Sequence, residues 1–168
     1  MEDRVKNAVF VYNRKISVKP KQVETLCHVL NGNNVLVNLP VGYGKSLIFH
    51  VLPELLKSDT KTTPIVIVIS PLNIIHKDQL SSLAEHSIPS YRLNIETKLC
   101  DFTEDGKVYE ANSDVNLDDV IAGKFRHVFC HPEALLNTSL GRKLLDNDDF
   151  CSLVVAVVVD GCHILDKW

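Results

Sequence analysis

The stretch that most constrains the fold is residues 39–46, which read LPVGYGKS. It follows the apolar run at residues 35–37 and precedes a helix-prone run at residues 46–56. We therefore expect a strand, a glycine turn and a helix in succession, which is the arrangement of a phosphate-binding P-loop. The general P-loop pattern has a glycine where this chain has Leu39, so the interpretation depends on the strand before the turn and the helix after it.

The residue types in this turn suit a phosphate ligand. Glycine at positions 42 and 44 allows backbone conformations in which several N–H groups point at one anion. Lysine at the next position adds a positive charge, and the serine hydroxyl after it suits Mg²⁺. The predicted nucleotide-binding residues of the turn are Val41, Gly42, Tyr43, Gly44, Lys45 and Ser46.

Length and composition favour one soluble domain covering residues 1–168. Apolar residues make up 45% of the chain and charged residues 23%, and no apolar run approaches the ~18 residues of a membrane span. The first ten residues, MEDRVKNAVF, lack the basic start and apolar core of a secretory signal. We expect an intracellular protein without a membrane partner. The net charge of −3 argues against a broad nucleic-acid-binding surface, so any such contact must be local.

The 5 cysteines are scattered and form no Cys-x-x-Cys pair, which argues against a disulfide framework or a zinc ribbon. One arrangement resembles a metal site, and it consists of His127, Cys130, His131, Cys162 and His163. Core or loop positions are the favoured interpretation of these residues over zinc ligation.

Hydrophobic periodicity predicts alternating helices and strands. Helices are expected at residues 2–13, from Pro20 to the Gly32 stop, and from Ser70 to Glu85, with shorter ones near 133–137 and 141–145. Strands are expected at residues 65–69, 91–95, 125–130 and 153–159, and the first and last of these are apolar throughout, as in strands covered on both faces. Residues 96–119 are expected to be a mobile insertion or loop with a short helix near 116–122.

This order predicts an α/β domain with a mostly parallel sheet, helices on both faces, and ligands at the carboxyl ends of the strands. Asp160 follows the last apolar strand, where P-loop nucleotidases place the carboxylate that holds Mg²⁺. The alternative is an aspartate that only caps a strand. The P-loop upstream favours the metal role.

Together these motifs resemble one family. The sequence VVVDGCHILDKW resembles the Asp-Glu-x-His box of superfamily 2 helicases, with Trp168 where RecQ-like helicases have a tryptophan. LPVGYGKS is similar to their first motif, which commonly lacks the leading glycine, and Gln22 lies in a segment similar to their adenine-reading glutamine motif, with Val18 where an aromatic residue is expected. The resemblance implies a RecA-like fold, the cofactors ATP and Mg²⁺, and a linking role for His163.

Two further segments resemble motifs that contact the DNA backbone in this family. One contains Ser70-Pro71-Leu72 with Lys77-Asp78-Gln79, and the other is similar to the Ser-Pro-Glu motif with histidine in place of serine. The resemblance therefore implies single-stranded or duplex DNA as a partner, bound weakly by this domain alone. The implied contacts are Ser70, Pro71, Lys77, Gln79, His131, Pro132 and Glu133.

The chain departs from the family pattern in two ways. Gly161 stands where the family has the glutamate that orients the attacking water. The sequence also contains no second RecA-like lobe, which in the family supplies arginines that stabilise the transition state. We therefore expect the ATP-binding lobe of a RecQ-like 3′–5′ helicase, without an intact catalytic residue and slow in hydrolysis. The family would place it in the nucleus of a eukaryote.

Three alternatives stay open at this point. A small-molecule kinase or another P-loop enzyme would need lid arginines, and only Arg126 and Arg142 follow the insertion. A non-catalytic nucleotide-binding or interaction module is favoured by Gly161. The sequence is also compatible with a piece of a longer gene or a decayed copy.

Overall fold

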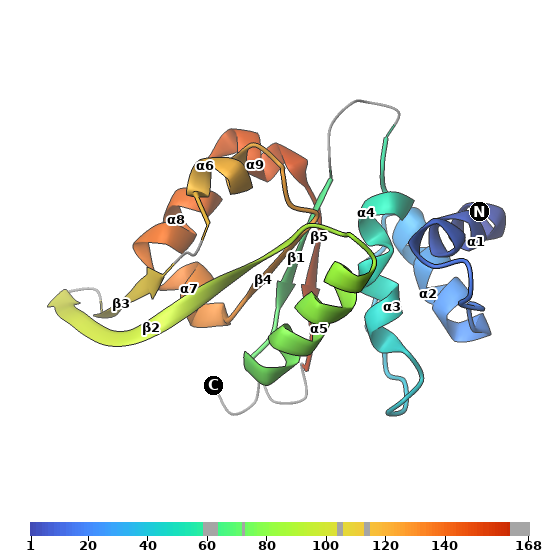
Figure 1. Cartoon of the computed structure of the whole chain (residues 1–168), viewed down its shortest axis with the longest axis horizontal. Helices are drawn as coiled ribbons and strands as arrows, with labels where there is room; N and C mark the ends of the chain where they lie inside the picture. The colour runs from blue at the N-terminus through green and yellow to red at the C-terminus, as the bar shows by residue number, and fades with distance from the viewer. Residues whose placement is uncertain (59–63, 72, 104–105, 113–114, 162–168) are drawn as a thin grey trace. The chain divides into compact units, whose positions relative to one another are not determined.

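The computed structural model describes residues 1–58, 64–71, 73–103, 106–112 and 115–161. The chain divides into two compact units, Met1–Lys61 and Thr62–Trp168 (Figure 1). The expectation of one domain over residues 1–168 stays a prediction.

The first unit is helical and consists of α1 (Glu2–Tyr12), α2 (Pro20–Leu30), α3 (Lys45–His50) and α4 (Leu52–Leu55). The amphipathic spacing in α1 buries Val5, Ala8 and Val9. Two polar contacts fix α1 to the later helices. The Arg4 guanidinium donates from Nε to the Leu55 carbonyl at 3.1 Å, and the Tyr12 hydroxyl lies 3.0 Å from Nδ1 of His50.

The helix that we expected over residues 46–56 is interrupted. It forms α3 and α4, separated at Val51, and Pro53 lies in the first turn of α4. Proline lacks a backbone N–H and its ring crowds the preceding turn, so a continuous helix through Pro53 would be strained. α2 agrees with expectation, since it begins at Pro20 and is followed by Gly32 with φ +77°.

The predicted strand at residues 35–37 is wrong. Residues 33–40 contain no strand, and the side chain of Leu36 is 86% exposed. A run of three apolar residues indicates a strand only if a neighbouring strand covers it. None of the described strands pairs with this segment.

The second unit contains a five-stranded sheet in the order β3-β2-β4-β1-β5. In chain order its strands are β1 (Ile65–Ile69), β2 (Ser90–Thr103), β3 (Gly106–Asn112), β4 (His127–Cys130) and β5 (Val154–Val159). The pairs β2–β4, β4–β1 and β1–β5 are parallel, and only β2–β3 is antiparallel (Figure 1). The mostly parallel α/β sheet expected from sequence is confirmed.

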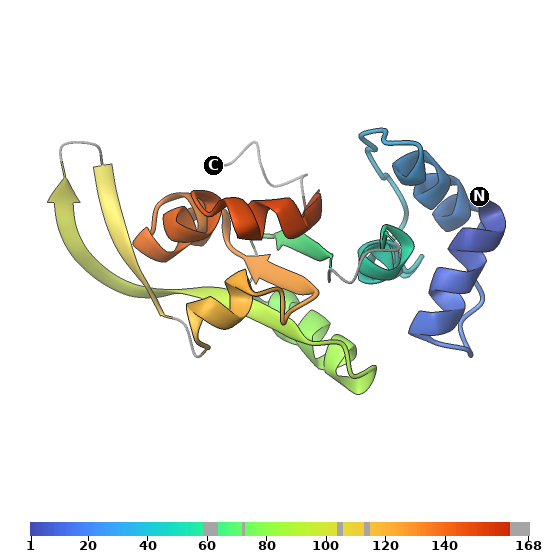
Figure 2. The ribbon, with the colours of Figure 1, turned by 90° about the horizontal axis from the view of Figure 1, so that it is seen from above.

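Helices lie on both faces of this sheet. α5 (Asn73–Glu85) lies on one side of the strands, and α8 (Ser139–Leu145) and α9 (Asp148–Leu153) lie on the other (Figure 2). The remaining helices are α6 (Leu117–Ile121) and α7 (Pro132–Leu136). The core on the side of α8 and α9 combines strand residues such as Ile67 and Val128 with Leu144 and Phe150, all of them buried.

The interval that we expected to be a loop contains most of a hairpin. β2 continues to Thr103 and pairs antiparallel with β3, with Thr103 opposite Gly106. The hairpin was not predicted because its residues are mostly polar. A hairpin at the edge of a sheet is held by backbone hydrogen bonds and needs no apolar run. The short helix expected near 116–122 is present as α6, and the Asn116 side chain accepts from the Asp118 N–H at its start.

The two wholly apolar strands differ in burial. β1 is buried along most of its length, as expected for a central parallel strand. β5 is the last strand of the described sheet, and Val157 is 59% exposed, so the expected cover on both faces is wrong for β5. Among the described residues, no helix combines the length and the hydropathy required to cross a membrane.

Candidate nucleotide-binding and strand-end site

The glycine turn has the backbone conformations that its sequence predicts. Gly42 and Gly44 have φ values of +79° and +90°, which side-chain-bearing residues rarely adopt. Gly44 is the residue before α3, so Lys45 and Ser46 are the first two residues of that helix. The Val41 side chain is 99% exposed, which places the tip of the turn in solvent.

The Lys45 ammonium closes the turn on itself. Its Nζ donates to the Leu39 carbonyl at 2.9 Å and to the Pro40 carbonyl at 3.2 Å. Two neutral carbonyl oxygens neutralise a positive charge only weakly, so an anion that entered the turn would compete well for this group. The arrangement suits a lysine that binds phosphate.

Sequence reasoning did not anticipate how Gln22 is placed. Its side chain is buried in the first turn of α2, and its Nε2 donates to the Gly44 carbonyl at 2.9 Å and to the Tyr43 carbonyl at 3.2 Å. Lys19 was also missed as a neighbour of the turn, and its ammonium lies 4.7 Å from the centre of the Tyr43 ring. The sequence features that could have predicted this cation–π contact are the basic Lys19 near Gln22 and the aromatic Tyr43 within the glycine turn.

The second unit brings three strand ends together. The Ser70 N–H, just after β1, donates to the Cys130 carbonyl of β4 at 3.0 Å. On the other side of β1, the Asp160 N–H donates to the Ile69 carbonyl at 2.9 Å. Ser70, His131 and Asp160 therefore follow the carboxyl ends of three adjacent strands, which is the edge where open α/β sheets bind ligands.

Gly161, next to Asp160, has φ +78°. A Cβ built at this position would meet Pro71 Cδ at 3.8 Å, which is an ordinary contact. Among the described residues, space is therefore available for a Cβ, and the backbone conformation is the obstacle to a side chain.

The segment after β4 forms a compact polar group. His131 precedes α7, Pro132 begins that helix, and His131 Nδ1 lies 3.3 Å from Glu133 Oε2. Pro71 is half-buried, and Lys77 and Gln79 lie on α5 with Lys77 exposed. The predicted nucleic-acid contacts thus come from the β1–α5 connection, from α5 and from the start of α7.

A buried basic group near these residues was not predicted. His76 on α5 is 1% exposed, and burial, reinforced by the positive charges of Arg92 and His131, lowers its pKa from 6.5 to about 4. Burial also lowers the pKa of Arg92. The sequence offered no distinct signal for this pair, because α5 and β2 both contain many polar residues.

The zinc interpretation gains no support from the described residues, among which no group of three or more His, Cys, Asp or Glu side chains is placed to hold a metal ion. Cys130 is fully buried, and burial raises the pKa of its thiol to about 12, which disfavours the thiolate that zinc requires. The predicted roles of Cys162, His163 and Trp168 lie outside the described residues.

Comparison with known proteins agrees with these motifs. A family model described as DEAD/DEAH box helicase matches residues 19–168. The ATP-dependent helicase SGS1 of Saccharomyces cerevisiae is 30% identical over 150 residues, which cover 89% of this chain and 10% of the relative. ATP-dependent DNA helicase Q-like 4B of Arabidopsis thaliana is 27% identical, over 94% of this chain and 13% of the relative.

The ATP-dependent DNA helicase RecQ of Haemophilus influenzae is 26% identical over 98% of this chain and 22% of the relative. The chain thus spans between 10% and 22% of the length of these relatives. The similarity covers the glycine turn, the strand ends and the elements between them. This chain belongs to the DEAD/DEAH box helicase family and is similar to its RecQ-type members.

Proposed function

We propose that this chain is the ATP-binding lobe of a RecQ-like DNA helicase, and that it binds MgATP but hydrolyses it slowly. The observation that carries the proposal is the glycine turn, in which left-handed Gly42 and Gly44 lead directly into Lys45 and Ser46. Family membership and the RecQ-type relatives support the assignment to a helicase. In a cell it would act on DNA, in the nucleus of a eukaryote.

In this proposal the backbone N–H groups of residues 41–46 surround the phosphates. The Lys45 ammonium exchanges the carbonyls of Leu39 and Pro40 for phosphate oxygens, which it binds more strongly because they are charged. No rearrangement of the glycines is needed, since both already have left-handed backbone conformations.

The Ser46 hydroxyl and the Asp160 carboxylate would hold Mg²⁺. Both are oxygen donors of the kind that Mg²⁺ prefers, and Asp160 lies at the carboxyl edge of the sheet. The ion, when bound, neutralises charge on the phosphates. The two residues belong to different units, so magnesium-dependent binding also tests whether both units contribute to one site.

Hydrolysis should be slow because no carboxylate at position 161 can orient the attacking water. Loss of a positioned general base typically costs ~10²–10⁴-fold in rate. A non-catalytic nucleotide-binding module is therefore the second candidate function. The observation that favours it is the left-handed backbone of Gly161, which a glutamate would strain.

Titration calorimetry with MgATP tests the nucleotide assignment. Lys45→Ala should weaken binding by roughly 10–100-fold, since hydrogen bonds to charged groups contribute about 1.5–3 kcal/mol. Lys15→Ala, which removes an exposed lysine of the same unit, is the matched control and should bind like the unmodified chain. The assignment fails if the folded, unmodified protein gives no binding heat up to about 1 mM MgATP, the upper end of usual KM values.

DNA would contact Ser70, Pro71, Lys77, Gln79 and the His131–Glu133 segment mainly through its phosphates. Such binding is independent of sequence and falls steeply with salt. Fluorescence anisotropy with a labelled single strand at ~50 and ~200 mM salt measures this dependence. Lys77→Ala should reduce the slope of log affinity against log salt concentration by about 1, as expected for the loss of one phosphate contact. Lys124→Ala, which also removes an exposed lysine, should leave this slope unchanged. An affinity that does not change with salt would contradict this mode.

A further inference from the structure

Basic side chains from three elements meet between α5 and the sheet. His127 and Phe129 lie on one face of β4, because side chains alternate along a strand, and His131 continues this alternation in an extended conformation. Arg92 of β2 is paired with Phe129, so it lies on the same face. α5 covers this face, since the ring centres of His76 and Phe129 are 5.9 Å apart. We call Arg92, His76 and His131 the strand-end basic cluster.

Positive charge predominates around His76. The charges of Arg92 and His131 both act on its ring and, after burial, are the main reasons why its pKa is low. Glu133 offsets part of this charge, since its Oε2 lies 3.3 Å from His131 Nδ1. Arg92 and His131 are partly exposed, whereas His76 is only 1% exposed. The titratable or charged groups on the elements around His76 are Arg92 on β2, His127 and His131 on and after β4, Glu133 on α7, Asp160 after β5, and Lys77 and Asp78 on α5.

The buried His76 ring has no hydrogen bond of normal geometry at either nitrogen. The Ser70 backbone favours a proton on the ring, but it affects the pKa less than burial and the two neighbouring charges do. Buried polar groups in folded proteins nearly always have a hydrogen-bond partner, so this ring calls for one. Because the neighbouring charges are positive, the group that suits the cluster is an anion.

We propose that the strand-end basic cluster binds one backbone phosphate of a nucleic acid, with Arg92 and His131 in contact with the phosphate and His76 taking up a proton from solvent. The choice of a nucleic acid rests on the proposed function, in which DNA contacts Ser70 and the His131–Glu133 segment at the same edge of the sheet. A guanidinium suits this role because it can donate two parallel hydrogen bonds to a phosphate. Arg92 lies outside every segment that resembles a helicase motif, so it adds a contact to that surface.

Phosphate binding and protonation are coupled in this proposal. Without a ligand, the charges of Arg92 and His131 disfavour a proton on His76. A phosphate beside them offsets these charges and attracts the proton, so the pKa of His76 rises when the nucleic acid binds. By linkage, the nucleic acid then binds more tightly in acid, because the proton and the phosphate favour each other equally.

Arg92→Gln tests the phosphate contact. Its affinity for a labelled single strand should fall by roughly tenfold or more, because a hydrogen bond between charged groups is lost. The slope of log affinity against log salt concentration, measured by fluorescence anisotropy at ~50 and ~200 mM salt, should fall by about 1. Arg92→Lys keeps the charge and should keep the slope, with an intermediate affinity because an ammonium cannot bind a phosphate at two points.

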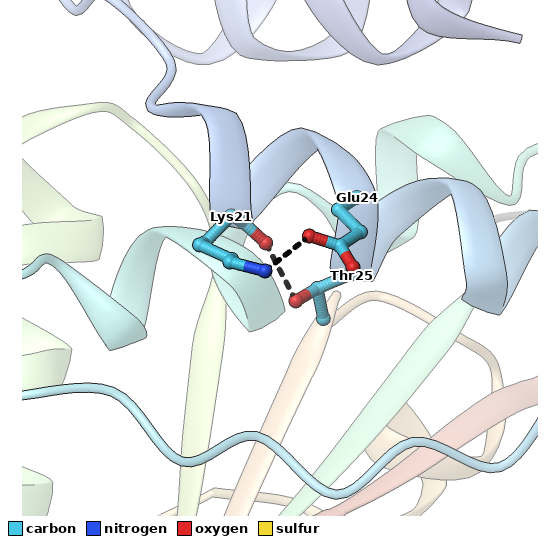
Figure 3. A network of polar contacts seen from close by, with 3 residues as sticks. All are labelled: Lys21, Glu24 and Thr25. Carbon is cyan, nitrogen blue, oxygen red and sulfur yellow. Dashed lines mark hydrogen bonds and ion pairs between the residues drawn. The ribbon is translucent and has the colours of Figure 1, made fainter.

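Lys21→Gln is the matched control, because it removes one positive charge from an exposed side chain of the first unit. Lys21 Nζ donates to Glu24 Oε2 at 2.8 Å on the exposed side of α2 (Figure 3). The Thr25 hydroxyl donates to the Lys21 carbonyl at 2.7 Å, a backbone contact that the substitution leaves in place (Figure 3). This variant should bind the strand like the unmodified chain. Equal behaviour of Arg92→Gln and Lys21→Gln would overturn the proposal.

The pH dependence of binding tests His76. If the phosphate returns the pKa of His76 to its ordinary value of 6.5, affinity should rise by roughly tenfold between about pH 7.5 and about pH 5.5. His76→Leu should lose this rise and keep whatever His131 contributes, so the difference between the two proteins measures the share of His76. His28→Leu, at an exposed position on α2, is the control and should behave like the unmodified chain. A rise of equal size in His76→Leu would show that His76 takes up no proton on binding.

Inorganic phosphate distinguishes a nucleic-acid site from a site for any free phosphate. The NMR signal of the His76 ring, identified by its absence from His76→Leu, reports the pKa directly. The single strand should raise this pKa, and inorganic phosphate at the same concentration of phosphate groups should raise it much less. An equal effect of the two ligands would make the nucleic-acid assignment wrong. If the unmodified chain binds no strand, the DNA role in the proposed function fails, and the titration with inorganic phosphate still decides whether the cluster binds an anion.

Discussion

The glycine turn of the first unit and the strand ends of the second unit are held in place in different ways. The glycine turn follows an exposed, strand-free segment and is fixed by side chains, chiefly by Gln22 and Lys45. The strand ends at Ser70 and Asp160 are fixed by backbone bonds to β4 and β1 above a buried core. A single polar substitution should therefore disturb the glycine turn, whereas the strand ends should respond mainly to changes in packing.

The largest expected effect is in the core below the strand ends. Phe150 on α9 is fully buried in the core of the second unit, so Phe150→Ala should lower the free energy of unfolding by about 3–5 kcal/mol. Phe10→Ala is the matched control, because Phe10 is 52% exposed, and its effect should be much smaller. Urea unfolding followed by circular dichroism measures both. Equal losses of unfolding free energy in the two variants would mean that Phe150 is no more buried in solution than Phe10.

Acid should weaken the strand ends through His76. The pKa of His76 is lowered from 6.5 to about 4 by burial and by the charges of Arg92 and His131, so the folded state binds fewer protons than the unfolded state between these values. The contribution to stability is therefore full above about pH 6.5 and is lost as the pH falls toward 4. We expect a loss of about 2 kcal/mol between about pH 7 and pH 5.

His76→Leu should reduce this pH dependence, because leucine cannot take up a proton. His28→Leu, at an exposed position on α2, should leave the dependence as it is. Urea unfolding at the two pH values, repeated for each variant, gives the comparison. If His76→Leu loses as much stability in acid as the unmodified chain, the dependence arises from other groups.

The third prediction concerns Gly161, whose φ of +78° is left-handed. Gly161→Glu should destabilise the protein by about 1–2 kcal/mol through backbone strain, although the described residues leave room for a Cβ. Phosphate release should rise only modestly, because the added carboxylate must first be held in position by its neighbours. Gly161→Asn is the control, since asparagine tolerates this backbone conformation. Brisk DNA-stimulated hydrolysis by the unmodified chain would show that another group replaces the glutamate.

Sequence alone predicted most of the second unit and the kinds of residue in the site. β1 and β4 were recognisable because their apolar patterns match their burial, and α5 begins and ends close to the helix expected after Ser70. The β2–β3 hairpin was missed because backbone pairing in a polar edge hairpin leaves no hydrophobic pattern. α9 was missed, although its sequence starts with a capping residue, Asn147, followed by two aspartates. The cap became evident only from the structure, in which the Asn147 side chain accepts a hydrogen bond from the Phe150 N–H.

The partners of the site residues could not be read from the sequence. The Gln22 amide contacts carbonyls more than twenty positions away, and the Arg92 charge acts on His76 from another element. Such contacts depend on how helices and strands pack, which periodicity does not determine. Motif spacing predicts which residues belong to the site, and the structure shows which contacts hold them.

The smallest expected effect is in the segment before the glycine turn, and it tests the sharpest difference between sequence and structure. Leu36 is 86% exposed, so Leu36→Ala should change the free energy of unfolding by no more than about 0.5 kcal/mol. Leu26→Ala in the same unit is the matched control, since Leu26 is fully buried and its loss should cost about 2–5 kcal/mol. Urea unfolding of both variants decides between the exposed segment and the strand that the apolar run predicted. A cost at Leu36 close to that at Leu26 would mean that the Leu36 side chain is buried in solution, as the predicted strand requires.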